Sequence, residues 1–233
     1  MCELCPRRCG VDRSSGATGF CGAGGSAVRI SRAALHAWEE PCISGTRGSG
    51  TIFFSYCTLR CVYCQNLPVS RGIAGIEVEI SRLAEIMLEL EAQGAHNINL
   101  VTPTHYAAQI LEAIEIARRR GLSLPIVYNT GGYELSSAIE RLRGAVDIFL
   151  TDYKYATNAD ALRYSGAADY IENADAALAK MVELAPLSFS SDGLLRSGVI
   201  VRHLLLPGKL TAAKNVLKRI FTRYQNRIYY SLM

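Results

Sequence analysis

The pattern of apolar residues in this 233-residue chain predicts an α/β fold with a parallel sheet, and its length and the absence of one glycine motif narrow the form of that fold. From Thr51 onward, short apolar runs alternate with segments whose apolar residues recur at helical spacing. This alternation is typical of βαβ units. A chain of this length suits one large domain that buries most of its apolar surface. Such a sheet lies open or curls toward a barrel, and no Gly-x-Gly-x-x-Gly follows a predicted strand, which weakens an open dinucleotide-binding fold.

The apolar runs predict six strands, at residues 51–54, 97–101, 125–129, 146–150, 198–206 and 227–232. Ser81 is predicted to cap the first core helix, whose apolar residues follow the i, i+3, i+4, i+7 rule: Leu83, Ile86, Met87 and Leu90. Further helices are predicted around 110–117, 139–142, 176–184 and 216–221. Because ligands gather at the carboxyl ends of parallel strands, chemistry is expected there.

Composition argues against several classes of protein. No run of about eighteen apolar residues exists, so a membrane span is not expected. The first residues lack the apolar segment of a secretory signal, so the eight cysteines favour a reducing cytoplasm with metal-bound thiols. The net charge of +4 comes from scattered residues such as Arg118 to Arg120 at a helix end, which argues against a nucleic-acid surface.

The most specific motif is a group of three cysteines, Cys57, Cys61 and Cys64, directly after the first predicted strand. Thiolates this close together indicate a metal site. Three of them would hold a 4Fe-4S cluster and leave one iron without a protein ligand. The alternatives are a zinc site and buried structural cysteines. Zinc sites usually pair two Cys or His halves, and no histidine follows Cys64 before His96.

Cys-x3-Cys-x2-Cys with Tyr63 before the third cysteine resembles the signature loop of radical S-adenosylmethionine (SAM) enzymes. The resemblance implies a partial (β/α)6 TIM-type barrel, a 4Fe-4S cluster, and SAM chelating the open iron through its amino and carboxylate groups. It implies an oxidoreductase that cleaves SAM reductively to methionine and a 5′-deoxyadenosyl radical for hydrogen abstraction. It also implies a low-potential electron donor, a flavodoxin or ferredoxin.

Residues 1–50 are predicted to form a Cys- and Gly-rich leader ahead of the core, residues 51–233. The leader contains a plausible four-thiolate set for zinc or a second iron-sulfur cluster: Cys2, Cys5, Cys9 and Cys21. The alternative is a flexible segment with free thiols. His36 and Cys42 each stand alone and are left unassigned.

The stretches Cys5-Pro-Arg-Arg-Cys-Gly and Gly19-Phe-Cys-Gly22 resemble the leader of the pyruvate formate-lyase activating enzyme-like branch. This likeness implies a glycyl-radical activase whose substrate is a partner protein. The chain ends inside the sixth predicted strand, where relatives continue, so we expect a truncated core. The competing hypothesis is an iron-sulfur electron-transfer or metal-binding protein that uses both cysteine groups without SAM.

The resemblance also suggests SAM contacts after the second and third strands. The family holds the SAM amino group with a Gly-Gly-Glu-type segment, where this chain has Thr102-Pro-Thr104-His. Thr102 and Thr104 would accept that hydrogen bond, unless Thr104 caps the next helix instead. Asn129-Thr130-Gly-Gly-Tyr resembles the family's Asp-Thr-Asn-Gly-aromatic segment, with Asn129 in place of the carboxylate.

Charged residues mark the ends of the fourth and fifth strands. Asp152 and Lys154 match the family's Asp-x-Lys segment and point to the same side by strand alternation. They are expected to pair beside the SAM sulfonium, and the alternative is a purely structural salt bridge. Arg202 lies in an apolar strand that resembles the family's Val-Arg-Tyr-Val-Val-Val-Pro-Gly. Such a charge needs a partner, which the carboxylate or ribose of SAM would supply.

Overall fold

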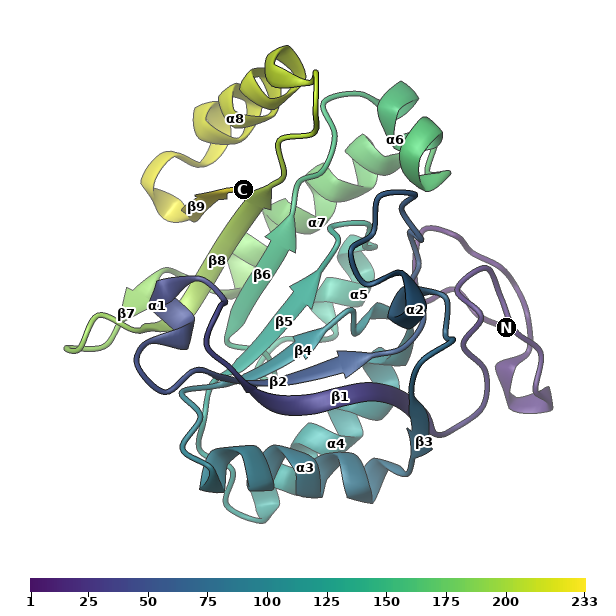
Figure 1. Cartoon of the computed structure of the whole chain (residues 1–233), viewed down its shortest axis with the longest axis vertical. Coiled ribbons are helices and arrows are strands. Elements are labelled where there is room, and N and C mark those ends of the chain that lie inside the picture. The colour runs from purple at the N-terminus through teal and green to yellow at the C-terminus, as the bar shows by residue number, and fades with distance from the viewer.

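The computed structural model describes residues 1–233 as a nine-stranded sheet covered by helices (Figure 1). The strands are β1 (Val28–His36), β2 (Ser49–Phe54), β3 (Ile76–Val78), β4 (Ile98–Val101), β5 (Ile126–Thr130), β6 (Ile148–Asp152), β7 (Ser188–Phe189), β8 (Leu195–His203) and β9 (Tyr229–Leu232). The helices are α1 (Pro41–Ser44), α2 (Leu67–Ser70), α3 (Ile80–Ala92), α4 (Ala107–Arg119), α5 (Ser136–Glu140), α6 (Asn158–Ser165), α7 (Tyr170–Leu184) and α8 (Leu210–Tyr224). Three short 3-10 turns are η1 (Arg13–Ser15), η2 (Thr104–Tyr106) and η3 (Gln225–Arg227).

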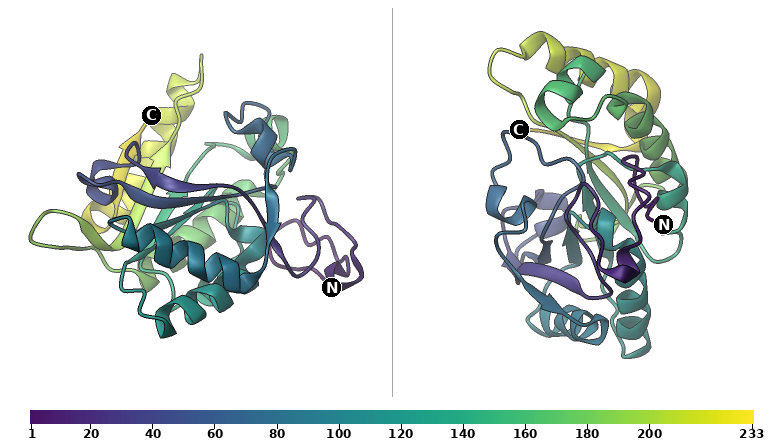
Figure 2. Two further views of the ribbon diagram at one scale, coloured as in Figure 1. Left: turned by 60° about the horizontal axis from the view of Figure 1, so that its bottom comes forward. Right: turned by 90° about the vertical axis from the view of Figure 1, so that its right-hand side faces the viewer.

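The six predicted strands all form and run parallel in the order β2-β4-β5-β6-β8-β9. Sheet order equals chain order, so every crossover steps in the same direction and the connecting helices stay on one face. Figures 1 and 2 show α3, α4, α5 and α7 along that face. The α/β fold with a mostly parallel sheet is confirmed, and its single direction of winding is compatible with a partial barrel.

The edges of the sheet hold strands that the periodicity did not predict. β1 pairs antiparallel with β2, and β3 pairs antiparallel with β1. Alternating burial is seen only in the first four residues of β1, and a register shift interrupts its pairing after Ile30, which explains why no strand pattern stood out there. Because β1 is bonded to β2, part of the predicted leader is a strand of the central sheet.

Helix α3 forms as predicted and buries Leu83, Met87 and Leu90, but the predicted cap at Ser81 is wrong. The chain leaves β3 extended at Glu79 and enters the helix at Ile80, so Ser81 already lies inside the first turn. The sequence analysis did not predict helix α6, which is short but has clear signals at both ends. The Thr157 hydroxyl accepts the Asp160 N–H at 3.2 Å, and Gly166 ends the helix in the left-handed region.

The sheet buries different residues on its two faces. The large core lies between the sheet and its helices and includes Phe149 and Val199. A smaller apolar cluster on the other, concave face contains Ile148, Leu150 and Ile200, which alternate with them along the same strands. Continuing this alternation brings Asp152 and Arg202 to the concave face at the carboxyl ends. The concave face is therefore apolar at one end and charged at the other.

Residues 1–25 form a looped N-terminal segment beside the carboxyl ends of the strands (Figure 1). Its only regular element is η1, and the Cys2 N–H and Val11 carbonyl close a loop at 2.8 Å. The Arg7 guanidinium donates to the Thr58 carbonyl at 2.9 Å and to the Ser165 carbonyl at 2.8 Å. Arg7 thus joins the segment to the three-cysteine loop and to the end of α6.

No helix in the chain combines the length and apolar character needed to cross a membrane.

Candidate functional site

The three-cysteine loop connects the carboxyl end of β2 to α2 and is sharply folded. Tyr56 and Arg60 both have positive φ angles, 75° and 53°, a conformation that side chains other than glycine seldom adopt. The Cys64 N–H also donates to the Cys61 carbonyl at 3.2 Å. Burial raises the pKa of Cys57, and the neighbouring Cys61 and Cys64 raise it further. The fold of the loop therefore brings the three thiols into one electrostatic group.

Glycine allows this loop to lie directly against the end of β5. A Cβ atom at Gly131 would come within 2.8 Å of Leu59 Cδ1 and 3.3 Å of Lys154 Cε. A side chain there would push the loop away from the sheet. Burial lowers the pKa of Lys154, but the charges of Asp152 and Cys61 outweigh burial and hold that pKa above its usual range. Lys154 thus lies between the cysteine loop and the charged end of the concave face.

Four predicted residues meet in one largely buried polar network at the carboxyl ends of β5, β6 and β8. Arg202 donates from Nε to Asp152 Oδ1 at 3.0 Å and from Nη2 to Asn129 Oδ1 at 2.8 Å. Lys154 Nζ donates to the other carboxylate oxygen of Asp152. Burial raises the pKa of Asp152, yet Lys154 and Arg202 together keep it below its usual range. Asn129 lacks a charge but serves as an acceptor for the guanidinium.

Two carboxylates that the sequence analysis did not assign complete this network. Glu39 and Glu40 lie just before α1 and reach Arg202 at 3.3 Å and 3.8 Å. Burial raises the pKa of Glu39, with Arg202 acting against it. Glu40 Oε2 is buried and has no hydrogen-bond partner. The adjacent pair was visible in the sequence, but no periodicity placed it beside a strand 163 residues away.

The charges of this network do not balance. Three carboxylates, of Asp152, Glu39 and Glu40, face two cations, Lys154 and Arg202, which leaves one negative charge when all are ionised. An unbalanced charge in a largely buried site is costly unless a proton or a ligand neutralises it. The network therefore favours a ligand that brings a positive charge.

Residues 51–194 match the family model of the Radical SAM superfamily. The chain belongs to the radical SAM superfamily. A relative from Methanocaldococcus jannaschii, itself an uncharacterized protein, is 28% identical over 218 residues. That alignment covers 90% of this chain and 58% of the relative, so the chain spans less than two thirds of the relative's length.

Membership of the radical SAM superfamily implies an enzyme with a 4Fe-4S cluster and SAM. The donor set of the cysteine loop fits such a cluster, because each of three thiolates binds a different iron. The Leu59 N–H points to Cys57 Sγ at 3.4 Å and the Ser165 hydroxyl to Cys61 Sγ at 2.9 Å, contacts that stabilise anionic sulfur. No three His, Cys, Asp or Glu side chains anywhere in the chain are placed to hold a single metal ion, and this holds for the cysteine loop as well as for the four cysteines of the N-terminal segment.

Thr104 and Thr130, which were predicted to contact SAM, are hydrogen-bonded to Glu134, a residue that the sequence analysis did not single out. Thr104 and Thr130 both donate to the same oxygen of Glu134, Thr130 at 2.5 Å. The alternative of Thr104 as a helix cap is wrong, because α4 begins at Ala107 and the Thr104 hydroxyl is committed to Glu134. Burial raises the pKa of Glu134 to about 7, and its second oxygen has no partner.

Thr102 lies apart from the Glu134 group. It has a φ angle of 60°, a strained value for a β-branched residue, and its N–H donates to the Asn129 carbonyl at 2.8 Å. Strain of this kind recurs at ligand sites of enzymes. This backbone bond joins Thr102 to Asn129, a member of the polar network.

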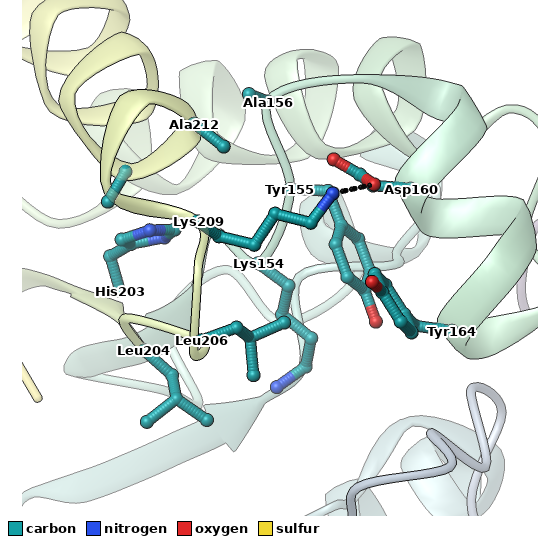
Figure 3. Close-up of a pocket in the computed structure, with 11 residues that line it drawn as sticks. Lys154, Tyr155, Ala156, Asp160, Tyr164, His203, Leu204, Leu206, Lys209 and Ala212 are labelled. Carbon is teal, nitrogen blue, oxygen red and sulfur yellow. Dashed lines mark hydrogen bonds and ion pairs between the residues drawn. The ribbon is translucent and has the colours of Figure 1, made fainter.

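Tyr63 belongs to a group of aromatic rings beside the cysteine loop. Its hydroxyl donates to the Tyr155 hydroxyl at 2.8 Å. Tyr155 and Tyr164 stack, and Figure 3 shows their rings side by side at a pocket that also contains the Lys209–Asp160 ion pair. The pocket has a volume of about 20 Å³, enough for a water molecule and no more.

Proposed function

We propose that this chain is a radical SAM enzyme whose cluster is held by Cys57, Cys61 and Cys64 and whose SAM lies along the carboxyl ends of β4, β5, β6 and β8. The observation that supports the proposal best is the position of the three-thiol loop beside a buried network that lacks one positive charge. The SAM sulfonium would supply that charge. Hydrogen abstraction from a substrate follows from the same chemistry.

A bound, reduced 4Fe-4S cluster would supply the electron for reductive cleavage of SAM to methionine and a 5′-deoxyadenosyl radical, the species that would abstract hydrogen from the substrate. Cys57, Cys61 and Cys64 would hold three irons as thiolates and would leave the fourth for the amino acid end of SAM. Asp152 and Glu39 provide negative charge toward the sulfonium, while Lys154 and Arg202 fix their positions. Burial of these groups keeps their electrostatic effect strong.

Arg202 has a double role in this proposal. Three of its N–H groups are engaged by Asp152, Asn129 and Glu39, and a guanidinium has five. The two remaining donors can bind the SAM carboxylate or ribose. The Thr102 carbonyl or hydroxyl oxygen would accept a hydrogen bond from the SAM amino group, and Tyr63 would line the adenosyl side of the site. Thr104 and Thr130 act at a distance, by holding Glu134 in place.

We further propose that the substrate is a protein and that the enzyme acts as a glycyl-radical activase. Val62 is 69% exposed between two of the cysteines, and Ile73 is 76% exposed just beyond α2. Apolar side chains around the cysteine loop suit contact with another polypeptide. The same face would admit a flavodoxin or ferredoxin as the low-potential donor. The Cys- and Gly-rich motifs of the N-terminal segment support the activase assignment by resemblance.

Reductive cleavage of SAM is the direct test. The anaerobically reconstituted protein, given dithionite and SAM, should release 5′-deoxyadenosine, while Cys61→Ala should release none. A protein with an intact cluster that produces no 5′-deoxyadenosine would favour an electron-transfer function instead. Incubation with a glycyl-radical protein of the formate-lyase type tests the activase role: a glycyl radical signal in electron paramagnetic resonance supports it, and SAM cleavage without that signal contradicts it.

A further inference from the structure

A chain of three hydroxyl groups ends on the sulfur of Cys61. The Ser165 hydroxyl lies 2.9 Å from Cys61 Sγ, the Tyr155 hydroxyl is hydrogen-bonded to the Ser165 hydroxyl, and the Tyr63 hydroxyl lies 2.8 Å from that of Tyr155. Ser165, Tyr155 and Cys61 are each less than 8% exposed. Nothing in the proposed SAM chemistry requires the serine or Tyr155, so the chain of hydroxyls needs another explanation.

The Tyr155 hydroxyl also lies 3.9 Å from Cys61 Sγ, but the Ser165 hydroxyl at 2.9 Å is the closer donor, and counting protons then orients the remaining hydrogen bonds. Each hydroxyl has one proton to donate. If Ser165 donates to Cys61, it must accept from Tyr155, and Tyr155 must accept from Tyr63. All three dipoles then point toward the sulfur. Hydrogen bonds arranged in this way polarise one another, and the low local dielectric strengthens them. The arrangement favours negative charge on Cys61 Sγ.

The fold holds Ser165 rigidly at this position. Ser165 is the last residue of α6, and the helix ends at Gly166 with a left-handed φ angle of 59°. Arg7 from the N-terminal segment donates to the Ser165 carbonyl at 2.8 Å and also binds the Gly166 carbonyl. Tyr155 is packed edge-to-face on Tyr170, with ring centroids 5.2 Å apart. The donor is thus positioned by backbone and packing contacts that do not depend on the cysteine.

We propose that Ser165 is a positioning residue that raises the reduction potential of the cluster, with Tyr155 and Tyr63 aligning its hydroxyl toward Cys61. The inference rests on the proposed function, in which Cys61 is a cluster ligand. Reduction adds negative charge that the cluster sulfurs share, so a hydrogen bond to the Cys61 sulfur is stronger in the reduced state. Hydrogen bonds to cluster sulfurs are one of the factors that set the potentials of such clusters. Removing this donor makes the cluster harder to reduce.

The test is a redox titration of the reconstituted protein, followed by electron paramagnetic resonance, after iron and sulfide have been measured. Ser165→Ala should shift the midpoint potential downward with full cluster content, and Ser165→Thr, which keeps a hydroxyl, should restore it toward the wild-type value. Tyr155→Phe should shift it downward by a smaller amount. Tyr164→Phe is the matched control: its ring stacks on Tyr155, its hydroxyl is not part of the chain, and its potential should equal that of the wild type.

The outcomes separate the two proposals. A wild-type protein that binds no cluster overturns the proposed function and this inference with it. A cluster present in the wild type and in Ser165→Ala at the same potential overturns only the inference. If Ser165→Ala loses its cluster, Tyr155→Phe decides, because that variant keeps the closer donor, Ser165, and loses only the longer contact of Tyr155 with Cys61: a lowered potential supports the inference, and an unchanged one overturns it.

Discussion

The chain contains two groups of cysteines, and their surroundings differ more than their spacing. Cys57, Cys61 and Cys64 lie in a loop that begins at the end of β2 and packs against the carboxyl ends of its neighbours. Cys2, Cys5, Cys9 and Cys21 lie in a segment with almost no regular structure, attached by Arg7 and Arg13 to backbone carbonyls of the core. Cysteine count alone therefore says little about function; the charges and strand ends beside the thiols say more.

Both groups nevertheless keep their thiols near one another. Burial raises the pKa of Cys5 to about 12, with Cys21 and Cys9 adding to the rise. The Phe20 N–H donates to Cys9 Sγ at 3.2 Å. What the N-terminal segment lacks is a cationic and anionic network like that of Asp152 and Arg202. The comparison suggests a structural use of thiols in one region and a chemical use in the other.

Cysteine substitution should separate the regions most strongly. Cys61→Ala is expected to lose essentially all cluster iron and SAM cleavage, since two thiolates cannot hold the cluster. Replacing Cys2, Cys5, Cys9 and Cys21 together by Ala should leave the iron and sulfide of that cluster in place, and should remove any zinc or additional iron that the segment binds. Metal and sulfide analysis of both proteins checks this. Loss of the cluster from the fourfold variant would contradict the division.

Two arginine substitutions, Arg202→Ala in the core and Arg7→Ala in the N-terminal segment, extend the comparison to stability. Arg202→Ala leaves Asp152, Glu39 and Glu40 with Lys154 as their only cation. Breaking a buried ion pair in this way costs about 3 to 5 kcal/mol of unfolding free energy. Urea unfolding measures it. Arg202→Lys should cost less because it keeps the charge, and a loss below about 1 kcal/mol for Arg202→Ala would contradict the geometry of the network.

Glu134 lies where the two regions meet, because its charge acts on the thiol of Cys5. Burial raises its pKa from 4.5 to about 7, so the folded protein holds this proton more tightly than the unfolded chain. The unfolding free energy that this proton adds is fully present below about pH 4.5. It is lost as the pH rises through about 7, a change of about 3 kcal/mol. Glu134→Gln should remove this dependence in unfolding measurements over that range.

The control for this pH dependence is Glu115→Gln, which breaks an exposed ion pair with Arg119. It should change the unfolding free energy by less than about 0.5 kcal/mol at any pH in the range. If the wild type and Glu134→Gln lose stability in parallel between pH 4.5 and 7, the buried carboxyl does not control the pH response.

The second arginine change should have a smaller and more local effect. Arg7→Ala removes charge-assisted bonds to the Thr58 and Ser165 carbonyls and the stacking of the guanidinium on Phe20 at 3.8 Å. We expect a loss of about 2 kcal/mol in the attachment of the N-terminal segment. Limited proteolysis should cut residues 1–25 faster while the rest of the chain unfolds near the wild-type midpoint. Equal cleavage rates in both proteins would show that Arg7 does not hold the segment.

Much of the fold could be predicted because local patterns determine it. The runs at 97–101 and 146–150 are apolar and flanked by helical periodicity, so β4 and β6 followed from the chain itself. β1 could not be predicted, because an irregular edge strand shows no clean alternation. The pairing of Asp152 with Lys154 also followed from alternation. Glu39 and Glu134 escaped prediction because their importance comes from contacts with distant residues, Arg202 and Thr104, that only the folded chain brings together.

The open iron of the cluster is the feature that separates SAM chemistry from simple electron transfer. The electron paramagnetic resonance spectrum of the reduced, reconstituted wild type should be recorded with and without saturating SAM. Because Cys57, Cys61 and Cys64 leave one iron without a protein ligand, binding of the amino acid end of SAM should visibly change the signal. A spectrum that is the same with and without saturating SAM would contradict SAM binding at the cluster.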